Sequence, residues 1–141
     1  MSTYSISIRV YYEDTDAGGV VYYANYLRFM ERARTEWLRE LGFEQDELSQ
    51  KDGVVFAVRN ASLEFIKAAR FNDVLQVNTT ITATGKASVA FKQIITRGDA
   101  LICSGEIRLA CVDAVRFIPK PIPALVIARI IATEKGTNAK R

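Results

Sequence analysis

The sequence predicts a single α+β domain in which a largely antiparallel five-stranded sheet wraps round one long helix. Two observations lead to this fold class. Apolar residues repeat at helical spacing over one long stretch, whereas five other segments show the alternating or β-branched pattern of strands. One of these strands precedes the helix and four follow it, an order that favours antiparallel pairing. The 141 residues are enough to bury one core without disulfides or metals.

The first two elements are a strand and the long helix. Residues Ser5–Tyr12 alternate, with Ile6, Ile8, Val10 and Tyr12 on one face, as in a half-buried strand. The spacing predicts a helix over Asn25–Leu41, followed by Gly42 as its C-cap. We expect the concave face of the sheet to cover the apolar stripe of this helix, which comprises Leu27, Met30, Ala33, Trp37, Leu38 and Leu41.

The second half of the chain is rich in strands. Residues 43–51 suit a short second helix or a loop, and Asp52-Gly53 marks a turn. Hairpin turns are expected at Gly85-Lys86 and at Arg97-Gly98-Asp99. The four predicted strands are Val54–Ile66, Asp73–Thr84, Ala87–Thr96 and Ala100–Cys111.

Prolines at 119, 121 and 123 end the folded part of the chain, because alternate prolines do not fit a central strand. We therefore assign residues 1–123 to the domain and residues 124–141 to a C-terminal short helix or tail. Within that region, residues 124–132 are apolar enough to form a helix that docks on the body or on another subunit. Residues 133–141 are predicted to be disordered.

Composition excludes several classes of function. The formal net charge is only +3, and much of it comes from the C-terminal tail, so we expect no nucleic-acid partner. The chain has no histidine, which excludes Ser-His-Asp catalysis and nearly all transition-metal sites. We expect no metal and no cofactor. Two cysteines, no signal-like N-terminus and no apolar run long enough to span a bilayer indicate a cytoplasmic protein in a reducing compartment.

The segment with the most chemical information lies between the first strand and the long helix. It places Asp16 next to Gly18-Gly19, just before the helix begins. A carboxylate can attack a carbonyl or activate water, and the N–H groups of a helix N-terminus stabilise an oxyanion. This combination indicates an acyl-transfer site. The alternative is that Asp14 and Asp16 are turn residues, which is the commoner role of aspartate beside glycine.

The segment from Arg9 to Arg39 resembles the opening of the YbgC and 4-hydroxybenzoyl-CoA thioesterase family. The shared stretch reads RVYYEDTDAGGVVYYANYLRFMERARTEWLR, and a second similar stretch reads FIKAARFNDVLQV from Phe65. The resemblance continues to about Pro121. It implies a hotdog fold, hydrolysis of acyl-CoA thioesters, and an active site shared between the subunits of a dimer that commonly pairs into a homotetramer.

The same resemblance implies specific site residues. Asp16 falls on the catalytic aspartate, as nucleophile or general base, and the backbone at Tyr23 and Ala24 polarises the thioester carbonyl. Gly19 and Val20 are expected to contact the substrate. The YbgC branch often has histidine where this chain has Tyr23, whereas the 4-hydroxybenzoyl-CoA branch also has tyrosine. We interpret Asp14 as a carboxylate that supports the loop.

A coenzyme A substrate carries phosphates, so basic or hydroxyl side chains should meet it. The candidates are Lys67, Arg70, Lys86 and Ser88. Two other functions remain open. One is a hotdog module that binds acyl-CoA or acyl carrier protein without turnover, and the other is a scaffold for envelope or lipid-synthesis partners.

Overall fold

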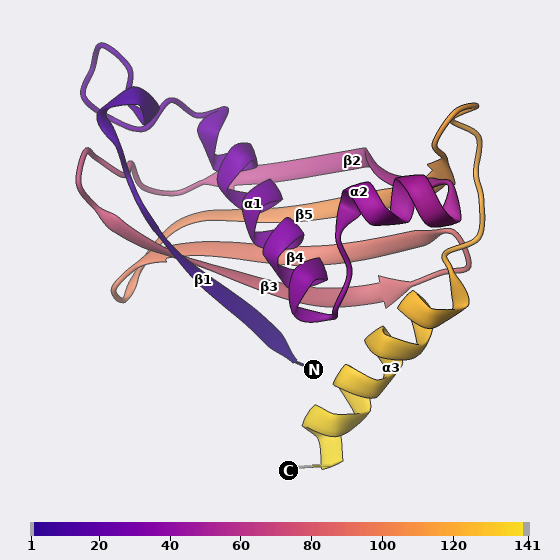
Figure 1. The fold of residues 1–141 in the computed structure, drawn as a ribbon. Coiled ribbons are helices and arrows are strands. Elements are labelled where there is room, and N and C mark those ends of the chain that lie inside the picture. The colour runs from indigo at the N-terminus through magenta and orange to yellow at the C-terminus, as the bar shows by residue number, and fades with distance from the viewer. Residues whose placement is uncertain (1, 140–141) are drawn as a thin grey trace.

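The computed structural model describes residues 2–139 and confirms the α+β class (Figure 1). One strand, a long helix and a short helical segment come first, then four strands and a C-terminal helix. No helix within this part of the chain is long and apolar enough to cross a bilayer. The elements are β1 (Thr3–Arg9), η1 (Tyr12–Asp14), α1 (Asn25–Glu40), α2 (Gln45–Glu47), η2 (Leu48–Asp52), β2 (Val54–Phe65), β3 (Val74–Thr84), β4 (Ser88–Arg97), β5 (Ala100–Asp113) and α3 (Ala124–Ala139).

The five strands form one sheet in the order β1-β3-β4-β5-β2, and every neighbouring pair is antiparallel. The two predicted hairpins join β3 to β4 and β4 to β5, and Gly98 in the second turn has a φ of 59°. The sheet therefore has two edges, β1 and β2. Strand β2 pairs only with β5, has a register shift between Val58 and Asn60, and is exposed along most of its second half.

Helix α1 lies across one face of the sheet and supplies much of the core (Figure 1). Trp37 packs edge-on against Phe91 of β4, with ring centroids 5.1 Å apart. Gly42 adopts a φ of 99° just after the helix and its N–H donates to the carbonyl of Arg39, as expected of a C-cap. The buried residues of the helix are Tyr26, Phe29, Met30, Ala33, Arg34 and Leu38.

Three predictions need correction, two about where elements end and one about burial. The first strand ends at Arg9 rather than Tyr12, because the Asp14 carboxylate accepts the N–H of Tyr11 at 2.8 Å and folds the chain into η1. Tyr12 is consequently exposed instead of facing the core. Leu27, expected in the buried stripe, is 41% exposed near the start of α1.

The third correction concerns the C-terminal region. Helix α3 continues to Ala139, so the prediction of disorder is wrong for residues 133–139, and residues 140–141 lie outside the described residues. Contacts with the body stabilise the helix: Arg129 donates to the carbonyl of Leu41 at 3.0 Å, and the Ser2 hydroxyl donates to Glu134 at 3.0 Å. A weak local helical preference is thus reinforced by tertiary contacts.

Candidate active site

The loop that carries Asp16 is a tight antiparallel turn. Thr15 and Val21 form an isolated bridge, the N–H of Asp16 donates to the carbonyl of Val20 at 2.9 Å, and the N–H of Gly19 donates back to Asp16 at 3.0 Å. Gly19 has a φ of 80°, a conformation that favours glycine. The turn holds Asp16 at an exposed corner, and Oδ1 of its carboxylate accepts the N–H of Gly18 at 2.9 Å.

Asp14 has a different role in the same loop. Its carboxylate accepts the N–H of Tyr11, while its carbonyl accepts the N–H of Tyr22 and the side-chain amide of Asn25, both at 2.9 Å. These contacts tie the loop to the first residue of α1. The geometry fits the expectation that Asp14 supports the loop.

The start of α1 offers free backbone donors. Ala24 is the N-cap residue and receives no side-chain capping bond. Within residues 2–139, neither the N–H of Tyr23 nor that of Ala24 has a hydrogen-bond acceptor. The Tyr23 side chain is 61% exposed and lies edge-on to Phe65 with ring centroids 6.0 Å apart. The helix N-terminus can therefore accept a partial negative charge from a ligand.

The connection between β2 and β3 lies alongside this loop. The N–H of Val21 donates to the carbonyl of Ala69 at 2.8 Å, and Val20 forms a bridge with Arg70. Arg70 and Lys67 are both exposed on this connection; the bridge to Val20 places Arg70 beside the Asp16 turn, whereas the N–H of Lys67 donates to the carbonyl of Ile102 in β5. Gly19 lies in the turn itself.

Asp73 anchors that connection. Its carboxylate accepts the N–H of Arg70 at 2.8 Å and the guanidinium of Arg97 at 2.7 Å. Burial alone would raise the pKa of Asp73, but these two donors outweigh it and hold the pKa below its usual value. The ionised carboxylate thus keeps the segment beside the Asp16 turn in place.

Lys86 and Ser88 lie at the other end of the sheet. They belong to the turn and strand that follow β3, whereas Arg70 precedes it, and the 11 residues of β3 span roughly 35 Å. The carbonyl of Lys86 accepts the N–H of Ile122, near the start of α3. Within one chain the structure does not bring these two residues together with Asp16.

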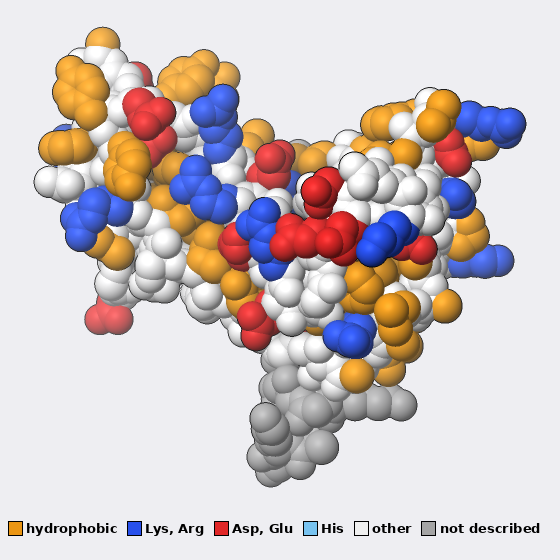
Figure 2. Space-filling model, viewed as in Figure 1, with side chains coloured by type: hydrophobic (Ala, Val, Ile, Leu, Met, Phe, Trp, Pro, Cys, Tyr) orange, Lys and Arg blue, Asp and Glu red, His pale blue; other side chains and the backbone are white. Residues whose placement is uncertain are grey.

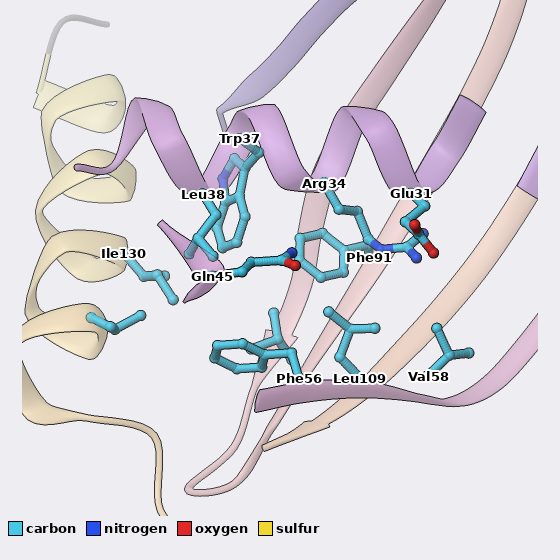
Figure 3. A pocket seen from close by; sticks show the side chains of 12 residues that line it. Glu31, Arg34, Trp37, Leu38, Gln45, Phe56, Val58, Phe91, Leu109 and Ile130 are labelled. Atoms are coloured by element: carbon cyan, nitrogen blue, oxygen red, sulfur yellow. The ribbon is translucent and has the colours of Figure 1, made fainter. Parts of the chain in front are cut away.

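A cavity of about 170 Å³ runs along α1 on the side that faces β2 (Figure 3). It begins at Glu31, about two turns into the helix, and does not include Asp16 or Tyr23. Glu31 and Arg34 lie at one end of it and Ile130 of α3 at the other. The lining residues are Glu31, Arg34, Trp37, Leu38, Gln45, Phe56, Val58, Val89, Phe91, Leu109, Val126 and Ile130.

Sequence reasoning missed the buried polar pair beside this cavity. Arg34 is only 7% exposed, and its Nη1 donates to Oε1 of the fully buried Gln93 at 2.9 Å. The amide nitrogen of Gln93 donates in turn to the carbonyl of Met30 and to Thr79, both at 2.9 Å. Burial lowers the pKa of Arg34, although a guanidinium stays charged. The available signal was that Arg34 falls one turn after Met30, on the apolar side of the helix.

The remaining reactive groups are few. Cys103 and Cys111 are buried free thiols, and burial raises the pKa of Cys103 to about 11. Among residues 2–139, no cluster of three or more His, Cys, Asp or Glu side chains is arranged to hold a metal ion. The chemical groups available at the Asp16 turn are therefore a carboxylate, backbone N–H groups and tyrosine hydroxyls.

A hotdog fold accounts for this sheet order, and the comparisons with known proteins agree on the fold and the family. Residues 18–104 match the family model described as Thioesterase superfamily, and the chain belongs to that superfamily. It is similar to the acyl-CoA thioesterase YbgC of Haemophilus influenzae, at 41% identity over 89% of this chain and 92% of the relative. It is also similar to the acyl-CoA thioester hydrolase YbgC of Escherichia coli O6:H1, at 43% identity over 86% of this chain and 90% of the relative.

Solved structures give the same result for the fold. The crystal structure of a probable thioesterase from Bartonella henselae matches with a TM-score of 0.83 and 31% identity, covering 86% of this chain and all of that one. The predicted family resemblance and the hotdog fold are confirmed.

Proposed function

We propose that this protein hydrolyses acyl-CoA thioesters and that Asp16 is its catalytic carboxylate. The observation that carries the proposal is the exposed Asp16 carboxylate in a tight turn, close in sequence to Tyr23 and Ala24, whose N–H groups lack acceptors just before α1 begins. Thioester hydrolysis needs both a group that attacks or activates water and a donor for the oxyanion. The names of the YbgC relatives support acyl-CoA as the substrate class.

In the proposed reaction the substrate carbonyl oxygen accepts the N–H of Tyr23 or Ala24. Asp16 either removes a proton from the attacking water or attacks the carbonyl itself. In the first case the tetrahedral intermediate expels the CoA thiolate, which takes up a proton, and the acid is released. In the second case an acyl-aspartate forms first and water then hydrolyses it. Both routes consume one thioester and one water, and both release one acid and one thiol.

We also propose that the protein acts as a homo-oligomer. The edge strand β2 is 12 residues long and has exposed backbone and apolar side chains, which proteins normally cover. Aromatic and aliphatic side chains are also exposed at the loop end of the molecule, seen at the upper left of Figure 2. A second copy would cover this surface and bring its own Lys86 and Ser88 within reach of a CoA bound at Asp16. Sedimentation that shows a stable monomer would refute this arrangement.

The expected binding contacts follow from the site. Gly19 and Val20 would form the wall beside the thioester, and Lys67 and Arg70 would meet the CoA phosphates at its mouth. We place the reaction in the cytoplasm, where CoA thioesters are made and thiols stay reduced. Two alternatives must be separated from hydrolysis. One is binding of acyl-CoA or acyl carrier protein without turnover, and the other is scaffolding of envelope or lipid-synthesis partners.

The test is thiol release from short, long and aromatic acyl-CoAs by the wild-type chain and by Asp16→Asn. We expect kcat to fall by roughly 10²–10⁴-fold in Asp16→Asn while KM changes little. Glu13→Gln is the matched control, because Glu13 is an exposed carboxylate in the same loop. Full turnover in Asp16→Asn would remove Asp16 from the mechanism. No turnover by the folded wild-type oligomer would favour a binding or scaffold role instead.

A further inference from the structure

The cavity beside α1 is closed at its far end by the C-terminal helix. Val126 and Ile130 of α3 are 1% and 3% exposed, and both line the cavity (Figure 3). Neighbouring residues of the same helix, such as Leu125 and Ile131, point away and are 60% and 46% exposed. One side of α3 is therefore an apolar wall of the cavity.

This wall is fixed to the body of the domain. Between Val126 and Ile130, Arg129 donates to the carbonyl of Leu41 at the end of α1 and lies over the ring of Phe43, 5.9 Å from its centroid. The negative end of the α1 dipole also stabilises a cation at this position. The contacts hold Val126 and Ile130 at a set distance from the start of α1.

The other end of the cavity faces the proposed reaction site along one side of α1. Leu27, Glu31, Arg34 and Leu38 follow each other at spacings of four, three and four, which places them on one helix face. Leu27 is the exposed apolar residue between the free N–H groups and the cavity. Glu31 lies seven positions after Ala24, which corresponds to about 10 Å along the axis.

We propose that this cavity receives the far end of the acyl group and that Val126 and Ile130 set the longest acyl group that fits. The proposal rests on the proposed thioesterase function and deepens it. A volume of about 170 Å³ is too small for a whole ligand but suits the end of one. Its walls are mainly aliphatic and aromatic, so they favour an apolar end. A two-carbon acyl group would stop short of Glu31 and would not meet α3.

The experiment compares kcat/KM over straight-chain acyl-CoAs of increasing length. Ile130→Phe should lower kcat/KM at least tenfold for the longest acyl group that the wild type accepts, because a pocket discriminates by roughly 10- to 200-fold per methylene. The kcat/KM for acetyl-CoA, if the wild type hydrolyses it, should change less than twofold in the same variant. Val126→Ala should shift the length preference upward. Ile131→Phe makes the same change one residue away on the exposed side and should leave the profile unchanged.

The outcomes separate this inference from the proposed function. An Ile130→Phe variant with a normal melting temperature and a wild-type length profile would overturn the role of α3 while leaving hydrolysis intact. If Ile130→Phe does not fold, Val126→Ala carries the test. If the wild type hydrolyses no acyl-CoA, the thioesterase proposal fails, and binding of a non-hydrolysable thioether analogue of hexadecanoyl-CoA, whose chain is long enough to pass Glu31 and continue along the cavity, tests the cavity alone. Weaker binding to Ile130→Phe than to Ile131→Phe would support it, and equal binding would refute it.

Discussion

Removing Gln93 should destabilise the protein strongly, and removing Arg34 in the same chain should cost clearly less than it costs in the wild type. Among the residues that the structure describes, Gln93 is the only acceptor for the Arg34 side chain, and none of their ion pairs includes Arg34. Glu31 affects Arg34 only through its longer-range charge. In Gln93→Leu a buried guanidinium therefore loses its hydrogen-bond partner, while Thr79 and the Met30 carbonyl each lose a donor.

The magnitudes follow from these contacts. Stranding a buried charge costs about 3–5 kcal/mol, which is the effect expected for Gln93→Leu. Arg34→Met keeps most of the packing and leaves Oε1 of Gln93 without its donor, a loss of about 1–3 kcal/mol. The double variant no longer contains the buried charge or that acceptor, so its loss should be about 1.5–3 kcal/mol smaller than the sum of the two single losses.

Urea unfolding of the four proteins measures this coupling. Arg39→Met and Glu44→Gln give a matched control cycle, because their ion pair is exposed and should show additive effects. Coupling between Arg34 and Gln93 below about 0.5 kcal/mol would refute the reasoning, since distant independent sites already add to within that error. Such weak coupling would mean that water or a partner chain accepts the hydrogen bonds of the Arg34 guanidinium.

Three further predictions concern the loop and the buried groups. Gly19→Ala should lower the free energy of unfolding by about 1–2 kcal/mol, because its φ of 80° is unfavourable for alanine although no atom blocks the new methyl group; equal stability in urea would contradict this. Asp73→Asn should be less stable than wild type at pH 7. Because the folded pKa of Asp73 lies below its usual value near 4, the difference should shrink as the pH falls from about 5 to 3, and a difference independent of pH would count against the ionised contact with Arg97. Cys103, with a pKa of about 11, should react with a disulfide reagent at pH 8 only as fast as the protein unfolds, whereas rapid labelling of the native protein would show that the thiol is accessible.

The sequence predicted local elements well where a local signal exists. The helix over α1, its termination at Gly42 and the turns of both hairpins depend on spacing and on glycine, and these were recovered. Strand β1 was extended too far because alternation continues through Tyr12, although the Asp14 carboxylate turns the chain earlier. Periodicity predicts a strand wherever the alternation continues, and it does not show that a side-chain contact ends the strand earlier.

Features that depend on distant contacts were beyond the reach of that reasoning. Pairing of β2 with β5 and of β1 with β3 decides which loops meet, and no local pattern contains that order. The sequence therefore offers Lys86 and Arg70 together as candidates to meet coenzyme A, yet β3 separates them. The buried pair of Arg34 with Gln93 likewise depends on a strand that is distant in the sequence, and no local pattern indicates it.

The hydrogen bond from the Ser2 hydroxyl to the Glu134 carboxylate joins residues 132 positions apart, so it can form only when the two ends of the chain meet. Strand β1 must also wait for β3, since Ser5 pairs opposite Asn78. Many native contacts join residues that are distant in the sequence, so we expect folding in milliseconds to seconds rather than microseconds. On the ribosome, the sheet can close only after β5 has emerged, and α3 can then seal the core. Until then the nascent chain exposes the apolar face of α1, which is the period when it would most need a chaperone.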